Sequence, residues 1–163
     1  MENINIRKAE IKDVKNMAEI EALCFPSAEA AKYEDFKIRF STFPGCFLIA
    51  EKDNTLVGFI DGAVTDKPNL PDELYHDMKF HNPCGDFQTV FSLAVTPKFQ
   101  HQGIGKMLMN SFIEDTENRG KKGIVLTCKD HLIGFYKTFG FVHKGISNST
   151  HGGAKWNDML LLF

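Results

Sequence analysis

The residues best suited to chemistry form a short loop between an apolar strand and a helix, within residues 91–106. Gln100, Gly103 and Gly105 follow a Q-x-x-G-x-G spacing, so the backbone N–H groups of the loop can converge on one point. The start of a helix adds a partial positive charge, and such a junction binds phosphate. The spacing matches neither a triphosphate-binding P-loop nor a dinucleotide fingerprint. The segment therefore predicts a phosphorylated cofactor at a strand-to-helix turn.

A second motif further along the chain agrees with the loop. Gly134, Tyr136, Gly140 and Phe141 follow the pattern G-F-Y-x-x-x-G-F. The two motifs in this order, separated by a helix and a strand, resemble the acyl-CoA signature of the GNAT family of N-acetyltransferases. The resemblance covers nearly the whole chain. It implies an α/β acyl-CoA N-acyltransferase fold, with a mixed, mostly antiparallel sheet of about six or seven strands flanked by helices.

The same resemblance assigns a set of residues to acetyl-CoA (coenzyme A). The strand before the loop pairs with the pantetheine arm, and the loop holds the pyrophosphate mainly through its N–H groups. Lys129 stands where many family members have asparagine, so it either reaches a cofactor phosphate or faces water. The cofactor-binding residues implied are Leu93, Ala94, Val95, Gln100, His101, Gln102, Gly103, Ile104, Gly105, Lys106, Lys129 and Phe135.

Tyr136 is the catalytic residue that the resemblance implies, as general acid. Acyl transfer from a thioester expels a thiolate, which a nearby phenol can protonate. The alternative is a core aromatic residue, since Phe135 and Phe139 flank Tyr136. The developing oxyanion would meet a strand N–H group, which we expect near Val95.

The general base stays open. The chain looks closest to the arylalkylamine N-acetyltransferase branch, which carries two histidines in the strand before L-A-V. This chain has Thr89 and Phe91 there, so the histidine relay is not implied. A water chain is one replacement. The side-chain candidates, each of which is otherwise an ordinary surface or structural residue, are Glu21, Glu29, His76 and His81.

Aromatic residues are abundant, with 15 phenylalanines, and predict a large core or an apolar pocket. Residues 67–85 are irregular and contain three prolines. Long loops of this kind are usually functional or mobile, so we expect this one to cover the acceptor. The candidate acceptor-pocket residues, for which core packing is the alternative, are Tyr33, Phe40, Phe80, Phe87 and Phe91.

Composition narrows the class of protein. The 163 residues fit one domain, residues 1–163, and the net charge of −2 gives no basic field for nucleic acid or a membrane. Residues 1–7 show no secretory signal, and no apolar run approaches a membrane span. The four cysteines lie far apart without a C-x-x-C pair, which predicts reduced thiols, no metal site and a cytoplasmic location. We expect a monomer or homodimer.

Hydrophobic periodicity predicts the elements that position these residues. Strands are expected over residues 4–9, 47–52, 56–65, 87–95, 123–128, 141–146 and 156–163. Helices are expected over residues 13–24, 28–40, 103–118 and 131–139, with a short one at 72–78.

These features together predict an acetyl-CoA-dependent N-acetyltransferase. The primary amine of a small molecule would attack the thioester directly in a ternary complex, without a metal. The alternatives are acetylation of a protein N-terminus or lysine, and a non-catalytic acyl-CoA-binding module. A dinucleotide oxidoreductase is disfavoured, because no acidic ribose-binding residue follows a first strand-to-helix turn.

Overall fold

The computed structural model describes residues 3–163, which form two compact units. The first contains the chain through Gly62 together with Ser92–Phe112, and the second contains Ala63–Phe91 and Ile113–Phe163. A single domain over residues 1–163 stays a prediction. The prediction that residues 1–7 form no secretory signal includes Met1 and Glu2, which lie outside the described residues.

The first unit is built on an antiparallel sheet with the strand order β1-β2-β3-β6. Asp53 and Asn54 join β2 to β3 with positive φ angles of 50° and 65°, as a tight hairpin requires. The strands are β1 (Ile4–Lys8), β2 (Phe47–Lys52), β3 (Thr55–Asp61) and β6 (Ser92–Val95).

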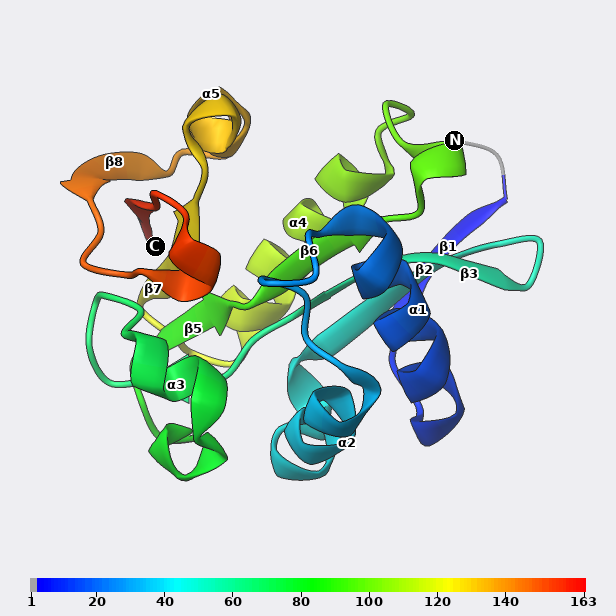
Figure 1. Ribbon diagram of the computed structural model, residues 1–163, viewed down its shortest axis with the longest axis horizontal. Helices are drawn as coiled ribbons and strands as arrows, with labels where there is room; N and C mark the ends of the chain where they lie inside the picture. The colour runs from blue at the N-terminus through cyan, green and yellow to red at the C-terminus, as the bar shows by residue number, and fades with distance from the viewer. Residues whose placement is uncertain (1–2) are drawn as a thin grey trace. The chain divides into compact units, whose positions relative to one another are not determined.

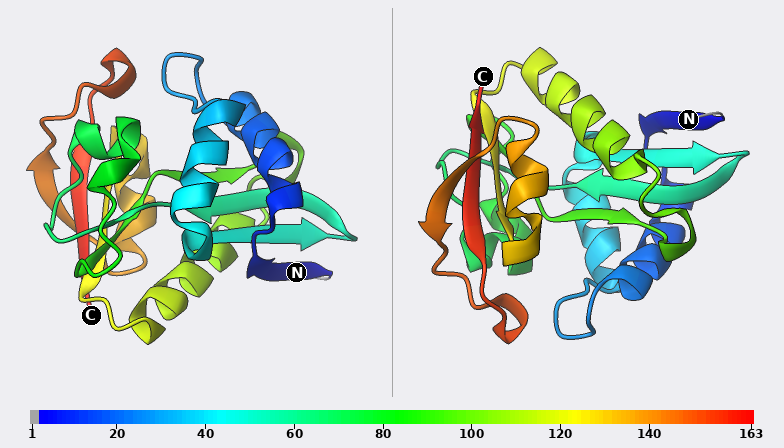
Figure 2. Two further views of the ribbon diagram at one scale, coloured as in Figure 1. Left: turned by 90° about the horizontal axis from the view of Figure 1, so that it is seen from below. Right: turned by 90° about the horizontal axis from the view of Figure 1, so that it is seen from above.

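Helices cover both faces of this sheet (Figure 2). Helices α1 (Val14–Cys24) and α2 (Tyr33–Thr42) lie on one face, where Phe36 meets Phe59 of β3 with ring centroids 5.5 Å apart. The first half of α4 (Ile104–Asn118) lies on the other face. A Cβ on Gly58 would come within 3.2 Å of the Leu108 side chain, so the glycine permits this close approach.

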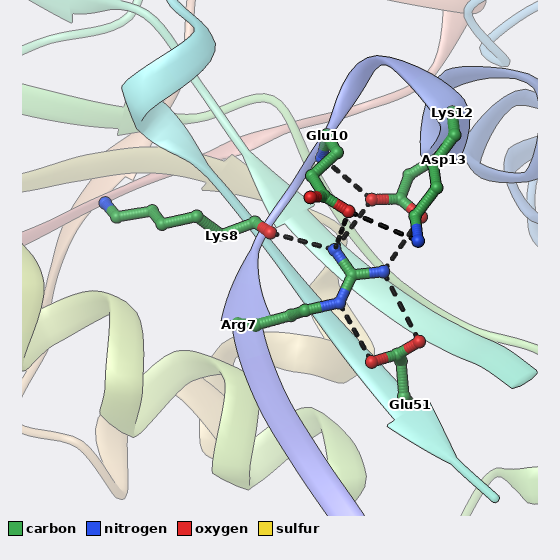
Figure 3. A network of polar contacts seen from close by, with 6 residues as sticks. All are labelled: Arg7, Lys8, Glu10, Lys12, Asp13 and Glu51. Atoms are coloured by element: carbon green, nitrogen blue, oxygen red, sulfur yellow. Dashed lines mark hydrogen bonds and ion pairs between the residues drawn. The ribbon is translucent and has the colours of Figure 1, made fainter. Parts of the chain in front are cut away.

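An ion-pair network fastens β1 to the start of α1 (Figure 3). The Arg7 guanidinium donates to both carboxylate oxygens of Asp13 at 2.8 and 3.0 Å, and to both of Glu51 at 2.8 and 3.3 Å. Asp13 also accepts the backbone N–H of Glu10 at 2.8 Å. Burial alone would raise the pKa of Asp13, but these hydrogen bonds outweigh it and lower the pKa.

The second unit contains a sheet with the strand order β4-β5-β7-β9-β8. Strands β5 and β7 lie side by side in parallel (Figure 1), and the other pairs are antiparallel. The strands are β4 (Val64–Thr65), β5 (Phe87–Val90), β7 (Gly123–Cys128), β8 (Val142–Ile146) and β9 (Asn157–Leu162). This unit also contains α3 (Asp72–His76), α5 (Ile133–Lys137) and the second half of α4.

The structure confirms the α/β class and the mostly antiparallel pairing, but the strands are divided between two sheets. The strand predicted over residues 87–95 is interrupted at Phe91, because β5 pairs with β4 and β7 whereas β6 pairs with β3. The strand predicted over residues 56–65 likewise separates into β3 and β4. The helix predicted over residues 28–40 begins only at Tyr33, because a turn at Pro26 comes first.

Residues 67–85, expected to form a loop over the acceptor, are tied down at several points within the second unit. Asp72 accepts the hydroxyl of Ser149 at 2.5 Å and the backbone N–H of Thr150 at 3.2 Å. Lys121 donates to the carbonyl of Gly85 at 2.8 Å. The segment contains α3, and hydrogen bonds to residues distant in sequence anchor it within the second unit.

Candidate active site

Strand β6 is the edge strand of the first sheet. The Thr96 N–H donates to the Val57 carbonyl at 2.8 Å, and alternate residues of an antiparallel strand bond to the same neighbour. Ala94 and Ser92 therefore direct their backbone groups toward β3. Leu93 and Val95 direct theirs to the opposite side, which is the free edge of the sheet.

The Val95 carbonyl at this edge is held by two side chains. Cys24, the last residue of α1, donates its thiol at 3.1 Å, and the Gln100 amide donates at 2.9 Å. Gln100 thus uses its side chain to tie the loop back onto β6. The edge presents the remaining backbone groups of Leu93 and the N–H of Val95.

The loop after β6 has the backbone geometry of an anion site. His101 and Gly103 adopt positive φ angles of 63° and 86°, and the Met107 N–H donates to the Gly103 carbonyl at 3.0 Å. Gly103 therefore caps α4, whose first N–H groups have no partner inside the helix. His101, Gln102 and Lys106 are exposed, whereas Ile104 is buried and Gly105 half-buried.

The surroundings of Gly103 fit a pyrophosphate. Apart from its chain neighbours, no atom of the described residues lies within 4 Å of a Cβ built on this residue, so the space beside Gly103 at the helix N-terminus is open. A helix N-terminus with a glycine in such a position lets an anion approach the backbone closely. The loop and the edge of β6 adjoin within one unit, so their residues together suit a phosphate followed by an extended amide chain.

Tyr136 lies in the second unit, on α5, and is buried. Its ring packs edge-on against Phe135 and Phe141, with centroids 5.1 and 5.7 Å away. Burial raises the pKa of Tyr136, and Cys128 and Tyr75 raise it further. The phenol therefore keeps its proton at neutral pH and can act as a donor.

The other cofactor residues predicted for this unit have partners inside it. The Lys129 ammonium lies 5.7 Å from the centroid of the Trp156 ring, a cation–π contact. Phe135 packs on Phe139 as well as on Tyr136, with 5.1 Å between centroids in both pairs.

The candidate bases have different surroundings in the structure. The His81 ring accepts the Val64 N–H through Nδ1 at 3.0 Å, and burial lowers its pKa, which points to a structural role. His76 is exposed, with its ring 5.9 Å from that of His151. Glu21 is buried in the first unit and accepts the Ala31 N–H at 3.0 Å.

Sequence reasoning missed two residues. Tyr75 stacks between Phe91 and His151, with centroids 4.7 and 5.1 Å away. Asp61 is completely buried at the end of β3, with Oδ2 3.3 Å from the Arg39 guanidinium. A charged residue that ends an apolar strand was a signal for Asp61, whereas only the fold brings Tyr75 to Phe91.

The predicted aromatic acceptor residues are distributed over both units. Tyr33 and Phe40 belong to the first, where Phe40 packs on Phe47, and Tyr33 is 44% exposed. Phe80, Phe87 and Phe91 belong to the second. Within residues 3–163, no group of three or more metal-ligating side chains converges, and no helix has both the length and the apolar character needed to cross a membrane.

The sequence model of the acetyltransferase (GNAT) family matches residues 14–141. The chain belongs to the GNAT family. Serotonin N-acetyltransferase of Mesocricetus auratus is 30% identical over 109 residues, which cover 66% of this chain and 51% of that protein. The chain therefore spans about half the length of this curated relative.

Solved structures confirm the GNAT fold. The loading GNATL domain of CurA from Lyngbya majuscula superposes with a TM-score of 0.84 at 16% identity, over 98% of this chain and 97% of that one. The structure of yncA from Salmonella typhimurium, solved with its cofactor acetyl-CoA, gives a TM-score of 0.73 at 17% identity, over 98% and 94%.

Proposed function

We propose that this GNAT protein is an acetyl-CoA-dependent N-acetyltransferase that acts on the primary amine of a small molecule. The observation that carries the proposal is the Gly103 turn, which opens the N-terminus of α4 directly after the edge strand β6. The acetyl-CoA in the yncA structure and the amine named in the serotonin N-acetyltransferase match support it. That match also supports the arylalkylamine-like branch.

The first unit would bind the cofactor in an extended form. Loop N–H groups around Gly103 hold the pyrophosphate, with Lys106 nearby on the first turn of α4. The edge groups of Leu93 and Val95 pair with the pantetheine amides, as in an added strand. Because the phosphate end lies at the loop, the acyl end lies toward the start of β6. We therefore assign the hydrogen bond to the oxyanion to the N–H of Leu93, which lies further from the loop than the N–H of Val95.

In the second unit, Tyr136 would supply the proton to the departing thiolate. Its raised pKa keeps the phenol protonated until charge develops on sulfur. The amine attacks directly in a ternary complex, so no covalent enzyme intermediate and no metal is needed. A cytoplasmic location and a monomer or homodimer remain predictions, and acetylation of a protein N-terminus or lysine is the alternative function.

The cofactor assignment is tested by Gly103→Val with Gly120→Val as a matched control. Gly120 also has a positive φ, 78°, and open space around a built Cβ, so the backbone strain of the two variants is similar. Calorimetry with acetyl-CoA should show binding to the parent and to Gly120→Val, and severe loss in Gly103→Val. Equal affinity of the two variants would exclude the loop as the pyrophosphate site.

The chemistry is tested by free-thiol release with a panel of arylalkylamines, aliphatic diamines and peptides. We expect one of the arylalkylamines or aliphatic diamines to be acetylated faster than any peptide. We also expect Tyr136→Phe to lower kcat about a hundredfold or more, while acetyl-CoA affinity and Tm stay unchanged. A preference for peptides would favour the protein-acetylating alternative. Acetyl-CoA binding without turnover would favour the non-catalytic module, and parental kcat in Tyr136→Phe would make Tyr136 a core aromatic residue.

A further inference from the structure

A buried carboxylate lies beside the first residue of β6. Asp61 ends β3 and pairs with Ser92 in the sheet register. Its exposed fraction is 0%, and its Oδ1 atom accepts no hydrogen bond within residues 3–163. A buried carboxylate oxygen without a donor costs stability, so its presence calls for a reason.

Three elements of the first unit bring charge to this point. The side chain of Asp61 lies on the same face of β3 as that of Phe59, because side chains alternate along a strand, and this face carries α1 and α2. Arg39 of α2 contacts Oδ2 at 3.3 Å. Glu21 of α1 is near enough to act on Asp61, while the neighbour on β2 is Phe47.

The balance of these groups leaves the carboxyl poorly stabilised as an anion. Burial raises the pKa of Asp61 to about 7, Arg39 opposes this, Glu21 adds to it, and the Ser92 backbone N–H opposes it weakly. A carboxyl that titrates near neutrality is suited to take up and release a proton during turnover. A second carboxylate beside it attracts cations.

Asp61 lies at the end of β6 where the proposed function places the acyl group. Under the proposed function, the phosphate end of the cofactor lies at the loop after Val95, and the arm extends along β6 toward Ser92. Asp61 pairs with Ser92, next to the assigned oxyanion donor Leu93. The carboxylate therefore belongs to the end of the strand where the amine must meet the thioester.

We propose that Asp61 is the missing general base, which binds the ammonium group of the acceptor and accepts its proton, with Glu21 beside it adding attraction for the cation. This inference rests on the proposed function. One N–H bond of the ammonium breaks, the electron pair stays on nitrogen, and the proton passes to Oδ1 of Asp61. The neutral amine then attacks the thioester carbon. As the tetrahedral intermediate collapses, the C–S bond breaks, Tyr136 gives its proton to the sulfur, and the second proton lost by the nitrogen restores the Tyr136 phenol. Asp61 returns the proton to water at the end of turnover, when the neutral amide product has left.

The test uses Asp61→Asn and two acceptors of similar shape. 2-Phenylethylamine is an ammonium ion at neutral pH, whereas phenylhydrazine is already neutral. We expect Asp61→Asn to lower kcat/KM about a hundredfold or more for 2-phenylethylamine, and by less than about tenfold for phenylhydrazine. The acid limb of the parental pH profile, with a midpoint of about 7, should disappear. Acetyl-CoA affinity should not change.

A second readout does not depend on turnover. With carboxyl-¹³C-labelled aspartate, one resonance of the parent should titrate near pH 7, shift when 2-phenylethylamine is added, and be missing from Asp61→Asn. Asp13→Asn is the matched control, because Asp13 is also a buried carboxylate paired with arginine in the first unit. It should keep the parental pH profile.

The possible outcomes separate the two proposals. A parent that binds no acetyl-CoA, or acetylates neither probe nor 1,4-diaminobutane, overturns the proposed function and this inference with it. An active parent whose Asp61→Asn variant keeps the pH profile, or loses both acceptors equally, overturns this inference alone. If Asp61→Asn does not fold, Glu21→Gln decides: a raised KM for 2-phenylethylamine but not phenylhydrazine supports the site, and equal KM values refute it.

Discussion

Two aspartate–arginine pairs in the first unit have the same composition and opposite electrostatics. Asp13 receives two short hydrogen bonds from Arg7, at 2.8 and 3.0 Å, and its pKa is lowered. Asp61 receives one long contact from Arg39, at 3.3 Å, and its pKa is raised to about 7. Both carboxylates are buried, with exposed fractions of 4% and 0%.

The difference shows that burial beside an arginine does not decide the charge of a carboxylate. Asp13 gains a third donor, the backbone N–H of Glu10, and its anion is fully satisfied. Among the described residues, no donor reaches Oδ1 of Asp61, and Glu21 acts on this carboxylate as a like charge. The first arrangement suits a structural anchor, and the second suits a group that exchanges protons.

The largest difference between the pairs should follow removal of the arginine. Arg7→Met leaves Asp13 and Glu51 without their cation, and we expect a loss of about 3 kcal/mol in the free energy of unfolding at pH 8. Arg39→Met should cost only about 1 kcal/mol, because Asp61 can take up a proton instead of staying charged. Urea unfolding of the parent and both variants at pH 8 measures these two losses in the free energy of unfolding.

The same experiment at pH 5 sharpens the comparison. Asp61 is protonated there in the parent, so the cost of Arg39→Met should shrink further, whereas the cost of Arg7→Met should persist. A larger loss in Arg39→Met than in Arg7→Met at pH 8 would show that Asp61 stays an anion without Arg39 and does not take up a proton.

The pH dependence of stability should also distinguish the two pairs. Since the pKa of Asp61 rises from 3.8 to about 7 on folding, the folded state binds more protons in this window, and Asp61 makes stability fall as pH rises through it. The pKa of Asp13 is lowered, so its contribution is present above 3.8 and is lost as pH falls through the folded value. Urea midpoints across pH 3–8 should therefore decline less toward pH 7 in Asp61→Asn, and less toward acid in Asp13→Asn. If the two variants exchanged these behaviours, the directions of both pKa shifts would be contradicted.

Local motifs were the most predictable part of the molecule. The glycine spacing after β6 predicted the helix N-terminus, and Gly103 has the positive φ that such a turn needs. Helix α1 and strand β7 also lie close to where periodicity placed them. Each depends on interactions between residues near in sequence, so the signal is contained in a short window.

Long-range contacts were not predictable in the same way. Cys24 reaches the Val95 carbonyl across 71 positions of the chain, and Gln100 uses its side chain on that same carbonyl. Tyr75 meets Phe91 only because α3 packs in the second unit. The break of the predicted strand at Phe91 left no mark in the sequence pattern, since the two halves are distinguished by their partners in the sheets.

The amino-acid sequence by itself therefore determined the family, the order of most elements, and the loop and tyrosine motifs, because these follow from backbone requirements of nearby residues. Only the tertiary structure decided which backbone groups of β6 face the free edge, and which of two Asp–Arg pairs is a satisfied anchor. Both depend on strand register and on side chains from separate elements, where a shift of a single residue or the loss of one donor reverses the result.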